Sequence, residues 1–293
     1  MSQPIPESQL VLNKEGAMYH LNLHPEQLAD DIILVGDPGR VGEIATFFDK
    51  IEVKRQNREL LTCTGYFNGK RITVLSTGMG TDNIDIVLNE LDALVNIDLK
   101  TRTPKEEHHA LNLIRIGTCG ALQPDIEVND SYVATRYAIG LDGLLYFYEK
   151  NKEVNEIGMR DAFIEQMDYP KDLPLPYAVE GSKELFDRLA EGYYNGITAT
   201  APGFYGPQGR TLRMLLSYPE NNRKMEAFNY QGWRVCNFEM ESSALYGLGK
   251  MMGHNCLTIC VVVANRVTEQ FSKDYHPFVK KLVINTLERL SAK

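Results

Sequence analysis

The alternation of strand-like and helix-like segments constrains the fold of this chain more than any other feature of the sequence. Residues 31–36 (DIILVG) form a short apolar run that ends at Gly-Asp-Pro-Gly, and apolar residues at helical spacing follow over residues 41–48. The same order of strand, turn and helix appears over residues 71–94 and again over residues 233–252. Strands that alternate with helices in this way predict an α/β fold with a central mixed β-sheet flanked by helices.

Further segments complete this pattern. Asn68-Gly69, the strongest short signal for a β-hairpin, joins two predicted strands. Other strands are predicted at residues 113–120, 196–201 and 257–266, and helices at residues 182–192, with Ser182 as N-cap, and 278–290. Residues 140–180 are polar and aromatic with weak periodicity, so we expect loops there. Because no low-complexity linker or repeat divides the chain, we expect a single domain over residues 1–293.

The charge balance limits the partners of the chain. Its 31 basic and 39 acidic residues give a net charge of -8, which argues against a broad surface for nucleic acids or anionic membranes. The N-terminus lacks the apolar segment of a signal peptide, and the longest strongly apolar runs, such as residues 259–264, are too short to span a bilayer. We therefore expect a cytoplasmic protein without membrane or nucleic-acid partners.

Cysteine and histidine usage gives little support for a disulfide or a metal site. The five cysteines are odd in number, scattered, and form no C-x-x-C pair, which favours reduced thiols in a cytosol. His108 and His109 follow two glutamates, a composition that metal sites also use. Because the surrounding stretch KTRTPKEEHH is polar, a solvated loop is the favoured interpretation of this pair.

Three predicted strand ends combine glycine with groups that bind anions. They are GDPGR (36–40), STGMG (76–80) and the end of LIRIGTCG (113–120), which carries Arg115 and Thr118. Glycine lets backbone N–H groups approach an oxyanion, a helix N-terminus adds positive potential, and arginine donates paired hydrogen bonds to phosphate. The set suits one small tetrahedral anion, because neither a nucleoside triphosphate motif nor a complete dinucleotide motif is present. The alternative is that the glycines only shape turns and the arginines pair with nearby acids.

The stretch GFYGPQGR (203–210) has the composition of a site for a planar ring. Its aromatic pair offers an apolar face, Gln208 offers an amide that donates and accepts, and Arg210 offers a fixed cation. Together these groups suit a heterocycle with a carbonyl and imide edge. The alternative is a surface loop anchored by Phe204 and Tyr205, and from this stretch alone that alternative is favoured.

Two glutamates flank Met240 in NFEMESSA (237–244), where a predicted strand gives way to a helix. On an extended segment Glu239 and Glu241 share a face, whereas in a helix they point about 200° apart. Their local spacing cannot place them across a scissile bond as an acid and base pair, so a glycosidase is disfavoured. A carboxylate can instead accept two hydrogen bonds from the vicinal diol of a ribose.

Seven motifs of the chain occur together in the order of a known family: GDPGR, the Arg58-Glu59 pair, STGMG, IRIGTCGALQP, FYGPQGR, NFEMESSA and VVVANR. They resemble the nucleoside phosphorylases of the trimer-or-hexamer type, and within that family the uridine phosphorylases. The matching pieces span residues 20–266, about four fifths of the chain. The resemblance implies a single α/β domain, no organic cofactor, and reversible attack of inorganic phosphate on C1′ of a nucleoside in pyrimidine salvage.

The same resemblance implies roles for individual residues. Phosphate is bound by Gly36, Arg40, Arg115 and Thr118, with Arg58 contributed by a neighbouring subunit. The ribose is bound by Glu239, Met240 and Glu241, and by His20 of the neighbouring subunit. The base is bound by Phe204, Gln208, Arg210 and Arg266. Residues borrowed from a neighbour imply a homo-oligomer with shared active sites, either a dimer or a larger assembly such as a hexamer.

Two places favour uridine over purine nucleosides. Purine-specific relatives usually carry an acid in a Ser-Asp pair after the strand that here ends in Asn265-Arg266, and this chain lacks that acid. The Q-x-R loop at Gln208 and Arg210 is the pyrimidine feature. The alternatives are a purine nucleoside phosphorylase, a nucleosidase of the same fold that uses water, and a catalytically idle nucleoside-binding protein.

The chain also departs from the family pattern. Thr81-Asp82-Asn83 stands where a Pro-Ser step usually follows STGMG, and the segment over residues 96–113 is longer than in compact members. Some members hold a monovalent cation between subunits. By resemblance, a potassium ion is expected at Glu59, Ile72 and Ser76.

Overall fold

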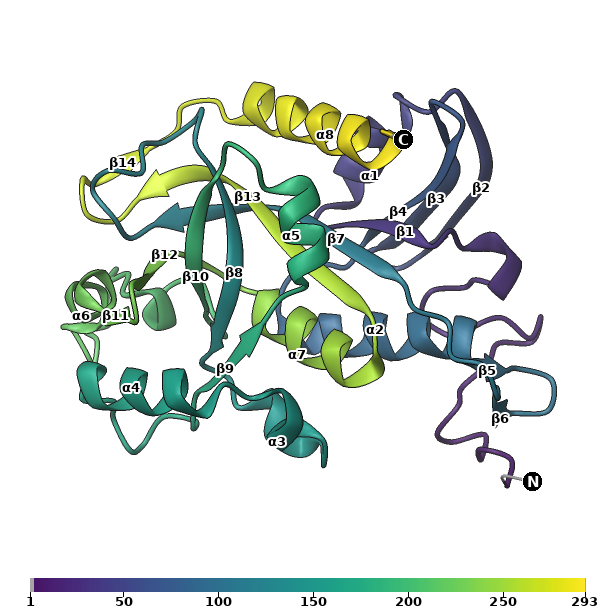
Figure 1. Cartoon of the computed structure of the whole chain (residues 1–293), viewed down its shortest axis with the longest axis horizontal. Helices are drawn as coiled ribbons and strands as arrows, with labels where there is room; N and C mark the ends of the chain where they lie inside the picture. The colour runs from purple at the N-terminus through teal and green to yellow at the C-terminus, as the bar shows by residue number, and fades with distance from the viewer. Residues whose placement is uncertain (1–2, 293) are drawn as a thin grey trace.

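One mixed β-sheet runs through the computed structural model, which describes residues 3–292 (Figure 1). Its main path contains, in spatial order, β11 (Asn229–Tyr230), β12 (Trp233–Glu239), β10 (Tyr194–Thr200), β8 (Tyr132–Gly140), β13 (Asn255–Asn265), β7 (Asn112–Ala121), β1 (Asp31–Val35), β4 (Lys70–Ser76), β3 (Leu60–Phe67) and β2 (Lys50–Asn57). Beside this path, β9 (Tyr177–Glu180) pairs with β8 and β14 (Gln270–Phe271) pairs with β13. Parallel and antiparallel pairs both occur, so the predicted α/β fold with a mixed sheet is confirmed.

The sheet closes on itself at the end of β7. Besides pairing with β10, β12 pairs through Asn237 and Phe238 with Ala121 and Gly120 of β7. The strands β12, β10, β8, β13 and β7 therefore form a closed ring. This closure places the ends of LIRIGTCG and NFEMESSA next to each other, although the two motifs are far apart in the sequence.

Helices cover both faces of the sheet (Figure 1). On one face, α2 (Thr81–Asn96) and α7 (Ser242–Met252) lie side by side and share a core with the strands. The other face is covered by α1 (Pro38–Ala45), α5 (Lys183–Leu189) and α8 (His276–Ser291). α4 (Ile157–Met167) and α6 (Asn221–Ala227) pack beside β10 and β12, and α3 (Asn151–Val154) packs against α7. Within residues 3–292, no helix has the length and apolar character needed to cross a membrane.

Two local predictions are confirmed in detail. Asn68 and Gly69 turn between β3 and β4 with φ values of 49° and 77°, the pair of positive angles that a type I′ hairpin requires. At the start of α5, the Ser182 hydroxyl accepts a hydrogen bond from the Leu185 N–H (3.3 Å), as an N-cap does.

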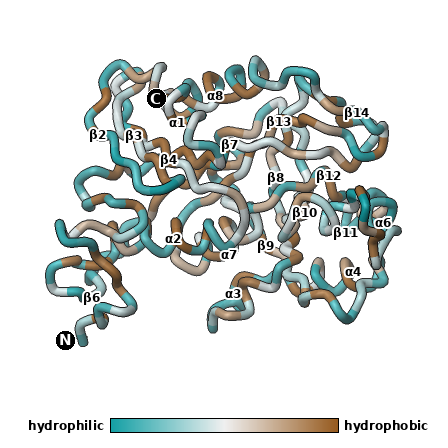
Figure 2. The backbone as a smooth tube through the Cα atoms, turned by 180° about the vertical axis from the view of Figure 1, so that it is seen from behind, coloured by the Kyte–Doolittle hydropathy of each residue, from teal (hydrophilic) through white to brown (hydrophobic). Residues whose placement is uncertain are grey.

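The strand β2, at one edge of the sheet, is not predicted from the sequence. Most of its side chains are polar, as its colouring in Figure 2 shows, and most are exposed, so it lacks the apolar pattern of a buried strand.

Residues 140–180 contain regular structure, so the expectation of loops there is wrong. They form the 3-10 helix η2 (Leu144–Phe147) as well as α3, α4 and β9. Along α4, Met159, Phe163 and Met167 recur every four residues and are buried, with the Phe163 ring centroid 5.4 Å from that of Phe228. This apolar stripe is narrow and interrupted by polar residues. It is stable as a helix because α6 and β12 supply the apolar surface that covers it.

Part of the segment over residues 96–113 folds against the N-terminal arm. β5 (Ile97–Asp98) and β6 (Thr103–Pro104) form a separate two-stranded sheet. From the turn between them, the Arg102 guanidinium donates hydrogen bonds to the carbonyl oxygens of Ile5 (2.8 Å) and Pro6 (3.2 Å). The segment thereby fixes the course of the arm that leads to His20.

His108 and His109 lie in a loop, as the sequence favours. The possible ligand atoms of Asp92, His108 and His254 all lie within 4.8 Å of one another. However, His254 Nδ1 accepts a hydrogen bond from the Leu111 N–H (3.2 Å), so its ring proton is on Nε2 and faces Asp92 at 3.2 Å. This tautomer favours hydrogen-bonded anchoring of the loop over metal ligation, which needs an unprotonated nitrogen.

Candidate active site

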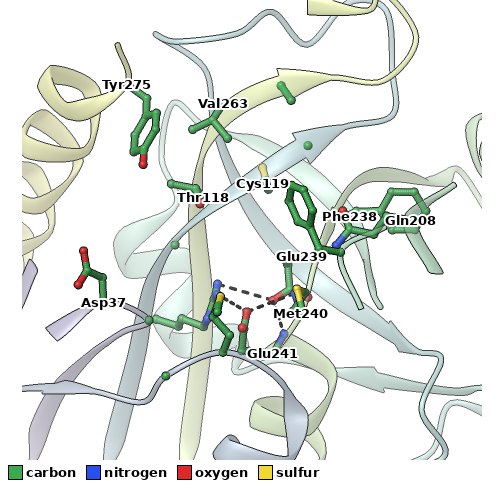
Figure 3. Close-up of a pocket in the computed structure, with 18 of the residues that line it drawn as sticks. Asp37, Thr118, Cys119, Gln208, Phe238, Glu239, Met240, Glu241, Val263 and Tyr275 are labelled. Atoms are coloured by element: carbon green, nitrogen blue, oxygen red, sulfur yellow. Dashed lines mark hydrogen bonds and ion pairs between the residues drawn. The ribbon is translucent and has the colours of Figure 1, made fainter. Parts of the chain in front are cut away.

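A cavity of about 710 Å³ opens where the ends of β7 and β12 meet the loop after β1 (Figure 3). The predicted ligands that line it are Gly36, Arg40, Arg115, Thr118, Phe204, Gln208, Arg210, Glu239, Met240 and Glu241. In Figure 3, Asp37 and Tyr275 lie on one side of the cavity, Gln208 and Phe238 lie on the other, and Glu241 lies between them. The fold thus gathers most of the predicted set in one place.

Arg115 is buried at the centre of the cavity floor. Its guanidinium forms ion pairs with Glu241 and, at 3.6 Å, with Glu239. Burial opposes the charge of Arg115, but Glu241, Cys260 and Glu239 keep its pKa above the usual value. Gly117 makes room for this arrangement, because a Cβ there would overlap with the Arg115 guanidinium. Arg115 is therefore the counterion of two buried carboxylates, and its contact with phosphate stays a prediction.

Glu239 holds the start of α7. One of its carboxylate oxygens accepts the backbone N–H groups of Glu241 (2.9 Å) and Ser242 (2.8 Å), and the other accepts the Thr200 hydroxyl (2.5 Å). These are the unpaired N–H groups that every helix N-terminus presents, so Glu239 acts as the cap of α7 from two residues upstream. Glu239 also lines the cavity, and its contact with a sugar stays a prediction.

Glu241 is a second buried carboxylate that lines the cavity. Its Oε1 accepts the Gly80 N–H (2.9 Å), and its Oε2 accepts the Met240 N–H (3.2 Å) and the Arg115 guanidinium. Burial raises the pKa of Glu241, and Arg115 opposes this rise. The Gly80 amide belongs to the STGMG loop, which the sequence assigns to an anion. In the structure that amide is directed at a carboxylate of the protein itself.

The opposite side of the cavity carries a cation without a carboxylate partner. Arg40 is half-buried, and its guanidinium makes only a long hydrogen bond to the Ile116 carbonyl oxygen (3.4 Å) and no ion pair within residues 3–292. Burial and the nearby Arg115 lower its pKa. Thr118 and Tyr275 border the same space (Figure 3). A dianion bound here would relieve the repulsion between the two arginines, as the prediction of a phosphate site requires.

At the far end of the cavity, Phe204, Gln208 and Arg210 of the loop over residues 203–210 contact one another. Arg210 Nη1 donates hydrogen bonds to the Phe204 carbonyl oxygen and to Gln208 Oε1, both at 2.6 Å. The Arg210 guanidinium also lies 3.7 Å from the centre of the Phe204 ring. Burial and the nearby Arg266 lower the pKa of Arg210 to about 10, which leaves it charged at neutral pH. The hydrogen bond between Gln208 and Arg210 thus holds an amide group and a cation next to each other at the cavity wall.

Arg266 does not line the cavity. It borders a neighbouring hollow with Phe204 and Arg210, and it donates a hydrogen bond to the Gly209 carbonyl oxygen (3.4 Å). Asn265 is buried, and its side chain donates to Gln123 and Ile126 and accepts from the two residues after Arg266. Arg266 therefore supports the Q-x-R loop, and its contact with a base stays a prediction.

His20 and Arg58 lie close together on the surface, and neither of them lines the cavity, although Glu59, the residue after Arg58, does. Arg58 is exposed in the turn between β2 and β3, with φ 50°. Beside it, the Asn57 side chain donates a hydrogen bond to the His20 carbonyl oxygen (3.0 Å), and His20 Nδ1 lies 2.7 Å from the Glu90 carboxylate. The two residues assigned to a neighbouring subunit thus share one surface.

The residues expected to hold a potassium ion do not converge. Ile72 and Ser76 stand at opposite ends of a run of four residue steps in β4, so their backbones are about 13 Å apart. The Ser76 hydroxyl donates to the Glu59 carbonyl oxygen (2.6 Å) and accepts the Leu61 N–H (2.8 Å). Because one ion cannot contact both ends of this run, the set does not fit a single cation site.

For two residues at or near the site, no role is predicted from the sequence. Glu90 is buried on α2, and its only signal is a carboxylate between Val87 and Leu91 on an apolar helical face. Tyr275, which directly precedes α8, also borders the cavity. It carries no sequence signal, because only the return of α8 across the sheet brings it there.

The chain is similar to known phosphorylases. Residues 30–292 match the family described as the phosphorylase superfamily. The uridine phosphorylase of Thermococcus kodakarensis is 32% identical over 262 residues, which cover 89% of this chain and 82% of that relative. The DeoD-type purine nucleoside phosphorylase of Bacillus cytotoxicus is 30% identical over 244 residues, 83% of this chain and 85% of that relative. The structure of Trypanosoma brucei nucleoside phosphorylase, described as showing uridine phosphorylase activity, is 32% identical with a TM-score of 0.88, and covers 97% of this chain and 100% of that one.

We expect Arg115→Met and Arg40→Met to separate the two arginine roles. Arg115→Met leaves Glu239 and Glu241 buried without their counterion, which should lower the free energy of unfolding by about 3–5 kcal/mol. Arg40→Met removes a cation that no carboxylate pairs with, so the free energy of unfolding should change by less than about 1 kcal/mol. Phosphate affinity of Arg40→Met should fall at least about tenfold. Urea unfolding and calorimetric titration with phosphate measure these quantities, and equal losses of stability in the two variants would contradict the division of roles.

Proposed function

The chain belongs to the phosphorylase superfamily, and we propose that it is a uridine phosphorylase, which converts uridine and phosphate reversibly to uracil and ribose 1-phosphate. The observation that carries this proposal is the order of groups along one cavity. An unpaired cation lies at one end, a buried carboxylate at the middle, and an amide beside a second cation at the other end. That order matches phosphate, ribose and a pyrimidine base in a line.

At the phosphate end, Arg40 and Thr118 bind and aim the nucleophile. Burial of a dianion is costly unless cations and donors replace its water, and Arg40 is available because it has no carboxylate partner. The backbone at Gly36 lets phosphate approach closely. Holding phosphate in line with C1′ makes the attack effectively intramolecular, which contributes on the order of 7–11 kcal/mol at best.

At the centre, Glu241 and Met240 hold the sugar. Glu241 accepts hydrogen bonds from the 2′ and 3′ hydroxyl groups, and the Met240 side chain provides an apolar surface beneath the ring. Arg115 fixes the Glu241 carboxylate and compensates its burial. The negative charge of Glu241 also lies near a carbon that becomes positive as the glycosidic bond stretches.

At the base end, Gln208 and Arg210 act on the leaving group, and Phe204 stacks on it. The bond between C1′ and N1 breaks with its electron pair moving to uracil, while a phosphate oxygen forms the new bond to C1′ with inversion. Charge then develops on the carbonyl and imide edge of uracil. Gln208 and Arg210 stabilise this charge chiefly in the transition state, and such donors raise kcat rather than ground-state affinity. Water protonates the released uracil anion, so no general acid is required.

The choice of uridine over purine nucleosides is supported by two local structures. The connected Gln208 and Arg210 pair presents a donor and acceptor edge that matches uracil. Asn265, at the place where purine-specific relatives usually carry an acid, is buried and bonded to backbone groups on all sides. An amide in these contacts cannot donate a proton to N7 of a purine.

The remaining features of the proposal concern the setting of the enzyme. We propose a single domain that needs phosphate as co-substrate and no organic cofactor. A potassium ion is not included, because Ile72 lies too far from Ser76 and Glu59 for one ion to contact all three residues. Five free and buried cysteines support a reducing compartment such as the cytoplasm.

A panel of nucleosides with and without phosphate tests the function. We expect uracil release from uridine only when phosphate is present, and a kcat/KM at least about a hundredfold lower for inosine and adenosine, because their bases do not present the edge of uracil to Gln208 and Arg210. Phosphate-independent release would indicate a nucleosidase, and preferred turnover of inosine would indicate a purine enzyme. Calorimetric binding of uridine without turnover would indicate an idle binding protein.

The assignment of the base site rests on Arg210. We expect Arg210→Ala to lower kcat/KM for uridine by at least about a hundredfold, the usual effect of losing one donor to a developing charge. Arg213→Ala is the matched control, since Arg213 is an exposed arginine three residues further on that does not line the cavity. Turnover by Arg210→Ala near the wild-type rate would rule out this base site.

We further propose that the active enzyme is a homo-oligomer in which His20 and Arg58 complete the cavity of a neighbouring subunit. Glu90, which holds His20, lies ten residues along α2 from the Gly80 amide of the chain's own site, about 15 Å along the helix axis. The shared surface of His20 and Arg58 fits delivery of both residues to one neighbouring site.

Mixed oligomers test this arrangement. Arg58→Ala and Glu241→Ala should each be inactive alone, but a co-expressed mixture should recover up to about a quarter of wild-type activity, because half of the dimers contain one site with neither change. The control is co-expression of Arg40→Ala with Glu241→Ala, whose changes both lie in the cavity of one chain. Each site of that mixture has one or the other change, so no activity should return. Failure of the first mixture to recover activity would show that Arg58 acts within its own chain.

A further inference from the structure

The carboxylate of Glu90 is bound entirely to one short segment of the chain. Its two oxygens accept the backbone N–H groups of His20 (3.0 and 3.1 Å) and Leu21 (2.8 Å), and Oε1 lies 2.7 Å from His20 Nδ1. Glu90 is 7% exposed on α2, a helix whose buried face is otherwise apolar apart from Thr81 at its start. A buried acid in such a place is costly unless its partners need it.

We propose that Glu90 is a positioning residue for the reaction, which sets the tautomer and the orientation of the His20 ring toward the 5′-hydroxyl of the nucleoside. This inference rests on the proposed function, and it adds a residue that does not touch the substrate.

The hydrogen-bond pattern determines the tautomer. Both Glu90 oxygens accept backbone N–H groups, so the carboxylate acts as an acceptor throughout. The short contact to His20 Nδ1 therefore places the ring proton on Nδ1. His20 Nε2 is left with a free lone pair, and a neutral His20 accepts a hydrogen bond from the 5′-hydroxyl.

The backbone contacts determine the orientation. Glu90 holds the peptide groups on both sides of the His20 Cα, and the Asn57 side chain holds the His20 carbonyl oxygen (3.0 Å). The His20 side chain is 30% exposed, so the ring is presented at the surface while its base is fixed. A residue that reaches into a neighbouring cavity needs this support, because the arm that carries it forms no helix or long strand.

Comparison of uridine with 5′-deoxyuridine tests the inference. With wild-type enzyme, we expect kcat/KM for uridine to exceed that for 5′-deoxyuridine by about tenfold, the scale of one hydrogen bond to the substrate. His20→Ala should abolish this preference. Glu90→Gln should reduce it at least about fivefold, because the glutamine amide donates to Nδ1 and moves the ring proton to Nε2, so that the 5′-hydroxyl must turn from donor to acceptor in a site arranged for it to donate.

Two further variants separate positioning from a structural role. In the His20→Ala background, Glu90→Gln should leave the ratio between the two substrates unchanged. Asp92→Asn is the matched control, since it removes another carboxylate of α2, one that faces His254 instead of His20, and it should keep the wild-type ratio. Equal losses for both substrates in Glu90→Gln would overturn the inference. No preference for uridine in the wild-type enzyme would instead show that His20 does not bind the 5′-hydroxyl.

One measurement does not depend on whether Glu90→Gln folds. Nitrogen-15 spectra of the wild-type imidazole groups, with His20 identified by its loss in His20→Ala, report which ring nitrogen carries the proton. We expect the Nδ1-protonated form, and the Nε2-protonated form would overturn the inference.

Discussion

The salt bridge between Arg115 and the two buried carboxylates of NFEMESSA is the interaction on which the rest of the site depends. It joins the centre of β7 to the start of α7, and through Glu241 it reaches the Gly80 amide at the start of α2. Replacing a buried ion pair with apolar groups often costs nothing, whereas removing one partner costs several kcal/mol. Stability alone therefore does not explain why this pair is charged. Its value lies in placing at a defined point the carboxylate of Glu241, which we propose binds the sugar.

The two glutamates show how one short motif divides its roles. Glu239 closes β12 and caps α7, while Glu241 faces the cavity. Both are needed for the geometry, since the capped helix start fixes the backbone from which Glu241 projects. The same division is seen between the arginines. Arg115 has carboxylate partners and holds the site together, whereas Arg40 forms no ion pair within residues 3–292, which leaves it available for an anion.

Helix α2 connects what we propose to be two different active sites. Its N-terminus supplies the Gly80 amide to the carboxylate of its own cavity, and its middle supplies Glu90 to the His20 segment. A rigid helix transmits the position of one end to the other, so the geometry of a chain's own site and the residues it offers to a neighbour are set by the same element. The loop around β5 and β6 adds to this by holding the N-terminal arm through Arg102.

Local patterns in the sequence were sufficient for many of the helices and strands and for most of the cavity. Apolar runs that end in glycine gave β1, β4 and β7, Asn68-Gly69 gave the hairpin, and GDPGR, FYGPQGR and NFEMESSA contain the groups that line the cavity. These predictions hold because strand ends, tight turns and helix starts are governed by interactions between residues close in the sequence. Where a pattern was weak, as in α4, the prediction failed because distant surfaces from α6 and β12 stabilise the helix.

Only the tertiary structure decided which groups pair. The partners of Arg115, the target of the Gly80 amide, the separation of Ile72 from Ser76 and the contact of Glu90 with His20 each join or divide residues across the fold. A sequence specifies which charges and donors exist, but a carboxylate becomes a cap, a counterion or a ligand according to what the closed ring of strands and the two layers of helices bring within about 3 Å of it. The sequence by itself therefore determined which charged and hydrogen-bonding groups this protein has. The fold determined which of these groups hold the site together and which remain available to a substrate.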